Sequence, residues 1–547
     1  MNNQKEIEQI IENIYKAHEQ SGLFDESLEN VLFKFTNAYD SLFLDEMRSS
    51  INKARKGLLL SLDNPNRNFD LLRHAYRACI KFAYESCKPG VFNQKCSRLD
   101  INAYEKELEE TVQFNFIRNT IDRYRLRKYS VSLEEGSLHF SNIKGKRPIV
   151  YDIYSRIFAD MIPGGKQSKD NVDVFNFNTE LARQSMNKQE FQSKKIFKPA
   201  KHVLLPVINK LLLYYLKDLD IDINLLRGKD YYLGEYLIVY SYFSAIAFFK
   251  TAYLLSLRGE NDLVNQPALV YPKERLVSDI KEITGLSEKS IQKVMRDMVY
   301  DYEFHKDKVT VFQPVFEIGD FYVCSCNMLF HSYIVDKVMK YFDNRGTNKP
   351  DLTLYHKYMS DRMNNRMADN LPILYPNLIT YKNCILTIDN KPQSEIDLLA
   401  FDTTSKTALL IELKNYTPVD NDADALRKEH HINEAIESRL IRDKRVLDNL
   451  KLFFKQNKIP ETYLNYSFSS LLVTDSYSGG VNVKEDIKVV DEALFYNLLS
   501  LSKGNLSEMI KSIETKQFFT MLDEILKKQN STEKYCYKGI TVRVTNE

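Results

Sequence analysis

Residues 394–414 run Ser394-Glu395-Ile396-Asp397-Leu398-Leu399-Ala400-Phe401, then Asp402-Thr403-Thr404-Ser405-Lys406, then Thr407-Ala408-Leu409-Leu410-Ile411-Glu412-Leu413-Lys414. The two apolar runs have the length of β-strands and the polar residues between them suit a turn, so the stretch predicts a β-hairpin. Because side chains alternate along a strand, Glu412 and Lys414 share one face while Ile411 and Leu413 take the other. Pairing across the turn brings Asp397 close to Glu412.

These three charged residues would meet on a sheet that is otherwise apolar, where unpaired charges are costly. Two carboxylates attract a hard cation such as Mg²⁺, which prefers oxygen ligands and keeps several waters. A bound metal lowers the pKa of its water and polarises a phosphoryl oxygen. The ammonium group of Lys414 can orient the attacking water or neutralise charge that develops on the phosphate. The set therefore predicts hydrolysis of phosphodiester bonds.

An acid on one strand followed by Glu-x-Lys on the next resembles the core signature of the PD-(D/E)XK nuclease superfamily. In that family the two acids bind Mg²⁺, the residue between Glu and Lys offers its backbone carbonyl, and the Lys assists the water. The resemblance implies these roles for Asp397, Glu412, Leu413 and Lys414. It covers roughly residues 351–501. The proline that gives the family its name is replaced by Ile396, at a position that varies widely in the superfamily.

The resemblance also suggests further site residues, and we expect Mn²⁺ to substitute for Mg²⁺. Members of the superfamily often add an acid from the helix before the strands, and Asp361 is our candidate for a third metal ligand. Its alternative role is a surface ion pair with a neighbouring arginine. Arg427 and Lys428, on the helix expected after the hairpin, are candidates for contacts with backbone phosphates.

Acid-x-Lys tripeptides occur elsewhere in the chain and predict nothing by themselves. The others are Asp279-Ile280-Lys281, Asp389-Asn390-Lys391, Asp486-Ile487-Lys488 and Glu514-Thr515-Lys516. Only Glu412-Leu413-Lys414 ends an apolar strand that follows another acid-bearing strand. The alternative for that tripeptide is an ordinary strand end with a solvated Glu–Lys pair.

The residues around this hairpin predict an α/β domain with a mixed central sheet, resembling restriction endonucleases. A polar helix is expected at 354–370 and a long charged helix at 423–456. Strands are expected at 469–474 and 487–490, with a helix at 491–501. Alternating strands and helices of this kind are typical of α/β folds. We place the domain at 351–547, after a polar linker at 344–350.

The preceding segment, 266–350, has the pattern of a winged helix-turn-helix. Helix 275–283, the turn Thr284-Gly285-Leu286-Ser287 and helix 288–298 precede a strand pair at 309–316 and 321–326. If the segment binds nucleic acid, the second helix makes the contact through Lys289, Gln292, Lys293 and Arg296. The alternative is a pair of packed helices that touch no nucleic acid.

The first 265 residues show apolar side chains at three- and four-residue spacing and predict a mainly α-helical region. A hairpin is expected at 129–141, around Glu134-Glu135-Gly136. The stretch from Tyr236 to Phe249 carries no formal charge, but it is shorter than the roughly 18–20 residues that a membrane span needs. We expect it to be the core helix of this region and expect no membrane association.

Composition limits the class of protein. A chain of 547 residues is too long for one core, and its net charge of +2 means that any nucleic-acid surface must be a local basic patch. Seven cysteines without paired spacing predict reduced thiols. The charged N-terminus, MNNQKEIEQI, is unlike a secretion signal. We expect a cytoplasmic protein.

Together these features predict a multidomain Mg²⁺-dependent endonuclease that acts on DNA rather than RNA. A large helical region joined to a compact nuclease resembles restriction and antiphage-defence effectors of prokaryotes, which implies a homo-oligomer or a partner protein from a defence system. The main alternative is a nucleic-acid-binding or scaffolding protein with an inactive nuclease fold. A transcriptional regulator built on the helix-turn-helix segment is a third candidate, but it would not require the carboxylate pair.

Overall fold

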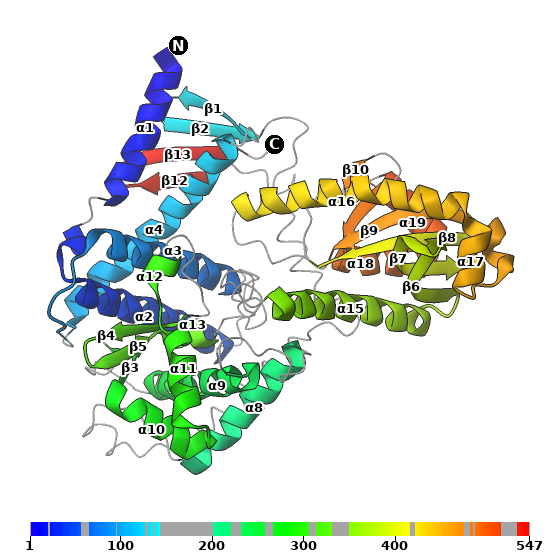
Figure 1. Cartoon of the computed structure of the whole chain (residues 1–547). Helices are drawn as coiled ribbons and strands as arrows, with labels where there is room; N and C mark the ends of the chain where they lie inside the picture. Colours follow the sequence, from blue (N-terminus) through cyan, green and yellow to red (C-terminus); the bar gives the residue numbers. More distant parts are fainter. Residues whose placement is uncertain are drawn as a thin grey trace.

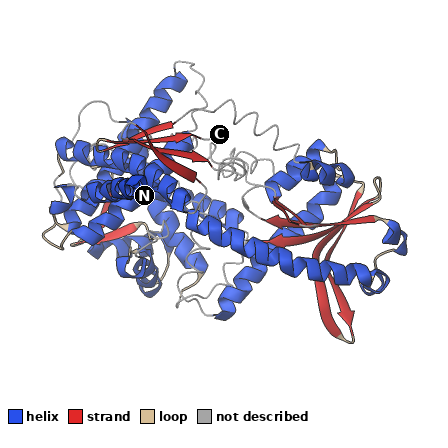
Figure 2. Cartoon of the chain, turned by 90° about the horizontal axis from the view of Figure 1, so that it is seen from above, coloured by secondary structure: helices blue, strands red, loops and turns tan. Residues whose placement is uncertain are grey.

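The chain forms a helical N-terminal region and a C-terminal region built on a mixed β-sheet (Figure 1). The computed structural model describes residues 2–19, 22–55, 65–93, 96–125, 129–134, 137–142, 201–219, 231–256, 266–305, 313–330, 349–415, 422–474, 482–484, 487–515 and 533–545. From above, helices dominate the N-terminal region, and strands cross the middle of the C-terminal one (Figure 2).

Long helices begin the N-terminal region. They are α1 (Asn2–Glu19), α2 (Leu28–Arg55), α3 (Pro65–Ser86) and α4 (Arg98–Arg125), with a short 3-10 helix η1 (Gly22–Asp25). Apolar residues at helical spacing on α2, such as Leu32, Phe35 and Tyr39, are buried against α3 and α4. The expected helical character of this region is confirmed.

A four-stranded sheet joins strands from residues 129–142 with strands from residues 533–545. The expected hairpin forms as β1 (Tyr129–Glu134) and β2 (Ser137–Asn142). Strands β12 (Glu533–Tyr537) and β13 (Ile540–Thr545) complete the sheet in the order β1-β2-β13-β12, with β13 parallel to β2. The range expected for the C-terminal domain, 351–547, must therefore be corrected, because its last strands pack with α1 and α4.

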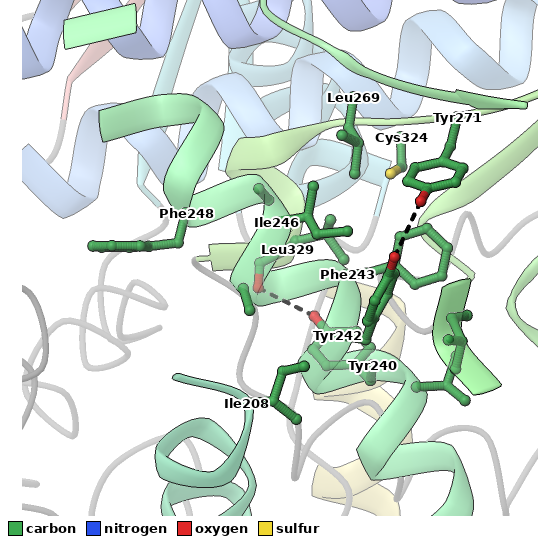
Figure 3. Packing of buried hydrophobic residues seen from close by; sticks show 14 of the residues in the cluster. Ile208, Tyr240, Tyr242, Phe243, Ile246, Phe248, Leu269, Tyr271, Cys324 and Leu329 are labelled. Carbon is green, nitrogen blue, oxygen red and sulfur yellow. Dashed lines mark hydrogen bonds between the residues drawn. The ribbon is translucent and has the colours of Figure 1, made fainter. Parts of the chain in front are cut away.

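The charge-free stretch lies in α9 (Leu233–Ser256), which packs on α8 (Lys201–Leu219). Among the described helices α9 alone is long and apolar enough to cross a membrane, but 89% of that apolar window is buried inside the protein. Figure 3 shows the hydrogen bonds of two of its tyrosines: Tyr242 Oη lies 3.2 Å from Tyr271 Oη, and Tyr240 donates to the carbonyl of Leu329. The helix is a core helix, as expected.

The middle segment begins with a strand that the sequence pattern did not reveal. Its elements are β3 (Leu269–Pro272), α10 (Lys273–Thr284), α11 (Glu288–Met298), α12 (Tyr302–His305), β4 (Val315–Ile318), β5 (Phe321–Cys324) and α13 (Cys326–Phe330). Gly285 ends α10 at a φ of 76°, which favours glycine, and Ser287 caps α11 by accepting from Ser290 N–H. The sheet order is β3-β5-β4.

This segment shares its core with the helices before it. Leu276, Ile291 and Met295 lie in one hydrophobic cluster with α9, while Phe316 and Val323 lie in another with α2 and α3. The described residues of this segment therefore share hydrophobic clusters with the helical region. Their sequence patterns differ, which is why the sequence alone suggested a separate domain.

The C-terminal unit contains a six-stranded mixed sheet in the order β10-β11-β9-β8-β7-β6. Its strands are β6 (Leu378–Ile388), β7 (Lys391–Asp402), β8 (Thr407–Lys414), β9 (Ser467–Thr474), β10 (Asn482–Lys484) and β11 (Ile487–Asp491). Its helices are α15 (Lys349–Leu374), α16 (Asp422–Asp448), α17 (Leu450–Gln456), η4 (Glu461–Asn465), α18 (Glu492–Leu501) and α19 (Leu506–Glu514). Strands β6, β7 and β8 are antiparallel, whereas β9 runs parallel to β8.

Helices cover both faces of this sheet, with α15 and α16 on opposite sides (Figure 1). Leu409, Ile411 and Leu413 of β8 pack with α15, α18 and α19 on one face. Ala408 and Leu410 pack with α16 and α17 on the other. The alternation expected along β8 is therefore present, and Glu412 belongs to the face covered by α16.

Candidate active site

The β7–β8 hairpin brings Asp397 and Glu412 together. The ladder runs from Asp402 opposite Thr407 to Leu398 opposite Ile411, so Asp397 and Glu412 are the next facing positions. Beyond this point the strands no longer pair, and the backbone N–H of Leu413 donates instead to Oδ2 of Asp397 at 2.8 Å. The carboxylate thus occupies the place of a backbone acceptor at the point where the ladder ends.

An irregularity in β7 turns Asp397 toward β8. Ile396 lies in the same hydrophobic cluster as Leu399, although strict alternation would put these residues on opposite faces. Asn383 stands opposite in β6 with a φ of 53°, and the regular pairing of β6 with β7 skips this position. The break lets the carboxyl group of Asp397 reach the backbone of Leu413.

Glu412 is 1% exposed and contacts three cations. Its Oε2 lies 2.6 Å from Nη1 of Arg439, while its Oε1 lies 2.7 Å from Nζ of Lys414 and 3.2 Å from Nη2 of Arg442. Burial would raise the pKa of Glu412, but these charges outweigh burial and hold its pKa below the ordinary value. Glu412 is therefore a buried, ionised carboxylate.

The pKa of Asp397 is shifted in the opposite direction. Burial, together with the negative charge of Glu412, raises the pKa of Asp397 to about 6, although the Leu413 N–H and Lys414 favour its charged form. Two carboxyl groups that repel one another in a buried place form a site in which an added cation would be stabilised.

The ion pairs continue from Glu412 into α16. Arg439 is fully buried, and its Nε lies 2.7 Å from Oδ1 of Asp443. Asp443 in turn accepts a hydrogen bond from the hydroxyl group of Ser470 on β9. Side chains three and four residues apart on a helix share a face, so Arg439, Arg442 and Asp443 all approach the sheet.

The carboxylate oxygens of Asp397 and Glu412 partly fit the coordination of a divalent metal ion. Asp397 Oδ1 accepts no hydrogen bond from the described residues, and Glu412 offers a second hard oxygen beside it. Both oxygens of Glu412 already contact cations, so a metal ion would share or replace one of those contacts. The residues that would hold it are Asp397, Glu412 and the backbone carbonyl of Leu413.

The third expected ligand, Asp361, is not brought to this pair, which corrects the expectation. Its helix, α15, packs on the sheet face opposite Glu412, through Met363 and Met367, and the side chain of Asp361 is exposed. No group of three or more metal-ligating side chains occurs in the part of the chain that the structure describes. The sequence correctly predicted a helix before the strands. It could not show which face of the sheet this helix covers.

The candidate nucleic-acid contacts have different environments. Lys428 is 5% exposed and makes contacts within the protein, so its ammonium group is not presented to a phosphate backbone. The side chain of Arg427 lies outside the described residues. On α11, Lys289 and Arg296 are exposed and Lys293 is partly buried, so the expected face of this helix is accessible.

Sequence reasoning missed Arg439, Arg442, Asp443 and Ser470. One signal was present: Ile432, Ile436, Arg439 and Asp443 follow one another at helical spacing, and the two isoleucines are buried on the sheet. Charged residues that continue an apolar stripe must find partners in the core, because unpaired charges there are costly.

A comparison of the chain with protein-family models, with curated proteins and with solved structures finds no match. The function must therefore be inferred from the chain's own residues and their geometry.

Proposed function

We propose that the protein is a metal-dependent endonuclease whose active site consists of Asp397, Glu412 and Lys414. The observation that carries the proposal is the end of the β7–β8 ladder, where Asp397 accepts from Leu413 N–H and Glu412 pairs with Lys414. The element order α15-β6-β7-β8-α16-α17-η4-β9 also contains the order helix, three strands, helix, strand expected from the resemblance to PD-(D/E)XK nucleases. We propose DNA as the substrate.

In this proposal each residue has a separate task. Bound Mg²⁺ or Mn²⁺ supplies an acidified water and a polarised phosphoryl oxygen. Asp397 and Glu412 hold the ion, and the Leu413 N–H fixes the direction of the Asp397 carboxylate. Lys414, whose side chain is 35% exposed, orients the attacking water or neutralises charge on the phosphate. Arg439 keeps Glu412 ionised from the core side.

One observation favours an alternative, a nucleic-acid-binding or scaffolding protein with an inactive nuclease fold. Arg439, Arg442 and Lys414 occupy both oxygens of Glu412. In an inactive site, such cations would replace the metal ion and stabilise the buried carboxylate permanently. In an active site, they would share Glu412 with the metal.

We also propose that residues 266–330 form a winged helix-turn-helix in which α11 contacts nucleic acid. The order β3-α10-α11-α12-β4-β5 and the sheet order β3-β5-β4 support this fold, and the exposed Lys289 and Arg296 support the contact. The β4–β5 hairpin packs on the N-terminal helices through Phe316 and Ile318. A purely structural role for the segment is the alternative.

The biological setting is a proposal by analogy of architecture. A helical region joined to a compact nuclease is the arrangement of restriction and antiphage-defence effectors. We propose a cytoplasmic role of this kind, with a second copy of the chain or a defence-system protein as partner. The helical region would then restrain the nuclease or recognise the trigger.

A cleavage assay tests the proposal. The full-length protein is incubated with circular and linear DNA, single-stranded DNA and RNA, with Mg²⁺, with Mn²⁺ and with excess chelator. Asp397→Asn, Glu412→Gln and Lys414→Ala should each lower the cleavage rate about a hundredfold or more, and chelator should stop the wild type. Glu395→Gln, which changes an exposed acid on the same strand, is the matched control.

Circular dichroism should show that each variant is folded. Cleavage that persists in chelator, or that survives Glu412→Gln in a pure preparation, would reject the metal-dependent site. A wild-type protein that binds nucleic acid but cleaves none of these substrates with either metal would favour the inactive-fold alternative.

A further inference from the structure

Three arginines lie one helical turn apart on α16, and their environments change from core to solvent. Arg439 is 0% exposed, the side chain of Arg442 is 28% exposed, and Arg445 is on the surface. Residues three apart on a helix point in related directions, and both Arg439 and Arg442 reach Glu412, whereas Arg445 lies a further turn along the helix and contacts Gln393 instead. Their hydrogen bonds show which of them can bind an external ligand.

Arg439 and Arg445 are unsuited to this task for opposite reasons. Arg439 holds Glu412 and Asp443, and the sheet and the helix bury it completely. Arg445 donates at 3.4 Å to the backbone carbonyl of Gln393, away from Glu412. The first is enclosed in the core and the second does not face the acid pair.

Arg442 combines accessibility with unused donors. Its Nη2 donates to Oε1 of Glu412 at 3.2 Å, and its Nε is buried without a hydrogen-bond partner in the described parts of the chain. A guanidinium group carries five N–H donors in a planar fork, so one contact to Glu412 leaves most of them unused. The side chain of Arg442 is 28% exposed, so a ligand at its accessible end could supply acceptor oxygens to donors that Glu412 does not use.

The neighbour of Arg442 indicates the chemistry of that ligand. Lys414 contacts the same oxygen of Glu412 and is also partly exposed, so two cations meet at the accessible side of the carboxylate pair. A planar guanidinium group binds the two non-bridging oxygens of a phosphodiester side by side, which an ammonium group cannot do.

We propose that Arg442 binds the phosphodiester group of the nucleic acid beside Asp397 and Glu412. The proposal rests on the proposed nuclease function and names the residue that holds the substrate at that site. Arg442 thus contacts the substrate directly, whereas Arg439 acts only through Glu412.

A binding assay separates this role from a structural one. Full-length protein carrying Asp397→Asn, which should bind without cleaving, is titrated with a fluorescein-labelled DNA duplex at several KCl concentrations. Adding Arg442→Met should weaken binding about tenfold, since a hydrogen bond to a charged group is removed. The slope of log affinity against log salt should fall by about 0.9, because one fewer counterion is released. Arg442→Lys should keep the slope but lose part of the affinity, and Arg445→Met should match the parent.

Cleavage by otherwise wild-type protein gives a second measurement. Arg442→Met should raise KM for DNA more than it lowers kcat, because the arginine binds ground state and transition state alike. A folded Arg442→Met protein with parental affinity and salt slope would overturn the proposal and leave Arg442 as a partner of Glu412 only. The same conclusion would follow if the Asp397→Asn protein bound no DNA. If binding depends on Arg442 but the wild type cleaves nothing, this proposal stands and the nuclease proposal fails.

Discussion

Asp397 and Glu412 face each other across one hairpin, and burial acts to raise the pKa of both, yet the pKa of Asp397 is raised and that of Glu412 is lowered. The difference lies in their partners. Glu412 contacts Arg439, Lys414 and Arg442, whereas Asp397 accepts one backbone N–H. Glu412 therefore stays ionised, and Asp397 holds its proton to a higher pH.

The raised pKa of Asp397 predicts how stability depends on pH in chelator. Below about pH 4 the carboxyl group is protonated in both the folded and unfolded chain. Between about pH 4 and 6 only the unfolded chain releases the proton, so the free energy of unfolding falls as pH rises. The rise in the pKa of Asp397 from 3.8 to about 6 corresponds to a loss of roughly 3 kcal/mol in the free energy of unfolding.

Asp397→Asn removes the titrating group but can still accept the Leu413 N–H. At pH 8 the variant should exceed the wild type in stability by up to roughly 3 kcal/mol, and the difference should vanish near pH 4. Urea unfolding followed by circular dichroism across this pH range measures the stability difference between variant and wild type, with Glu395→Gln as control. A difference that is constant with pH would show that Asp397 is not the group responsible.

Arg439 supports a second prediction at the level of single residues. Arg439→Met leaves Glu412 and Asp443 buried without their main partner, so unfolding free energy should fall by about 3–5 kcal/mol. Arg445→Met, six residues later on the surface of α16, should change it by no more than about 0.5 kcal/mol. Urea unfolding of the purified variants tests both values. A loss below about 1 kcal/mol for Arg439→Met would mean that the buried acids find other compensation.

The proposed catalytic residues could be found from sequence because they depend on local geometry. Strand alternation and hairpin pairing place Asp397, Glu412 and Lys414 within one short stretch. Arg439 and Arg442 could not be assigned in this way. Their approach to Glu412 depends on where α16 crosses the sheet, and that follows from packing over residues 432–489.

Among the elements, α16 and α17 illustrate what periodicity can and cannot predict. One helix was expected at 423–456, and two form, separated at Asn449, whose side chain donates to the carbonyl of Arg445. The break lets Gln456 and Asn457 bond the backbone of Thr387 and Ile385 on edge strand β6. Strand β3 was missed because it is short and ends in Pro272.

Helix α11 supports a prediction at this scale. Its exposed face carries Lys289 and Arg296, with Lys293 partly buried between them. Replacing all three with alanine should weaken binding to duplex DNA and lower the slope of log affinity against log salt by about 0.9 for each phosphate group that the helix no longer binds. Anisotropy titrations over a range of KCl concentrations measure the slope. A wild-type slope in the folded variant would favour the purely structural role of the segment.

At the scale of the whole molecule, the C-terminal unit is an insertion between strands of another sheet. Strands β1 and β2 precede it and strands β12 and β13 follow it, and all four share one sheet. The hydrophobic clusters of the unit contain only residues between Met363 and Ile513. The unit therefore has its own core, although the chain returns to the N-terminal region afterwards.

This arrangement predicts which fragment folds alone. Residues 349–515 should be soluble, folded and capable of metal-dependent cleavage, with less selectivity than the full chain. The longer fragment 351–547 should be less soluble, because β12 and β13 would lack α1, α4 and β2 as partners. Size-exclusion chromatography and cleavage assays at matched concentrations compare them with the full-length protein. A folded but inactive 349–515 fragment would show that the helical region supplies substrate binding or assembly contacts.

The position of β13 between β2 and β12 also fixes the order in which the protein is completed during synthesis. Domains fold as they emerge from the ribosome, at roughly 5–20 residues per second. The unit that carries Asp397 and Glu412 is complete once residue 515 has emerged, whereas the sheet that contains β1 and β2 must wait for β12 and β13. A product that stopped between these two points would carry the whole candidate site on a molecule whose first sheet still exposed the open edge of β2.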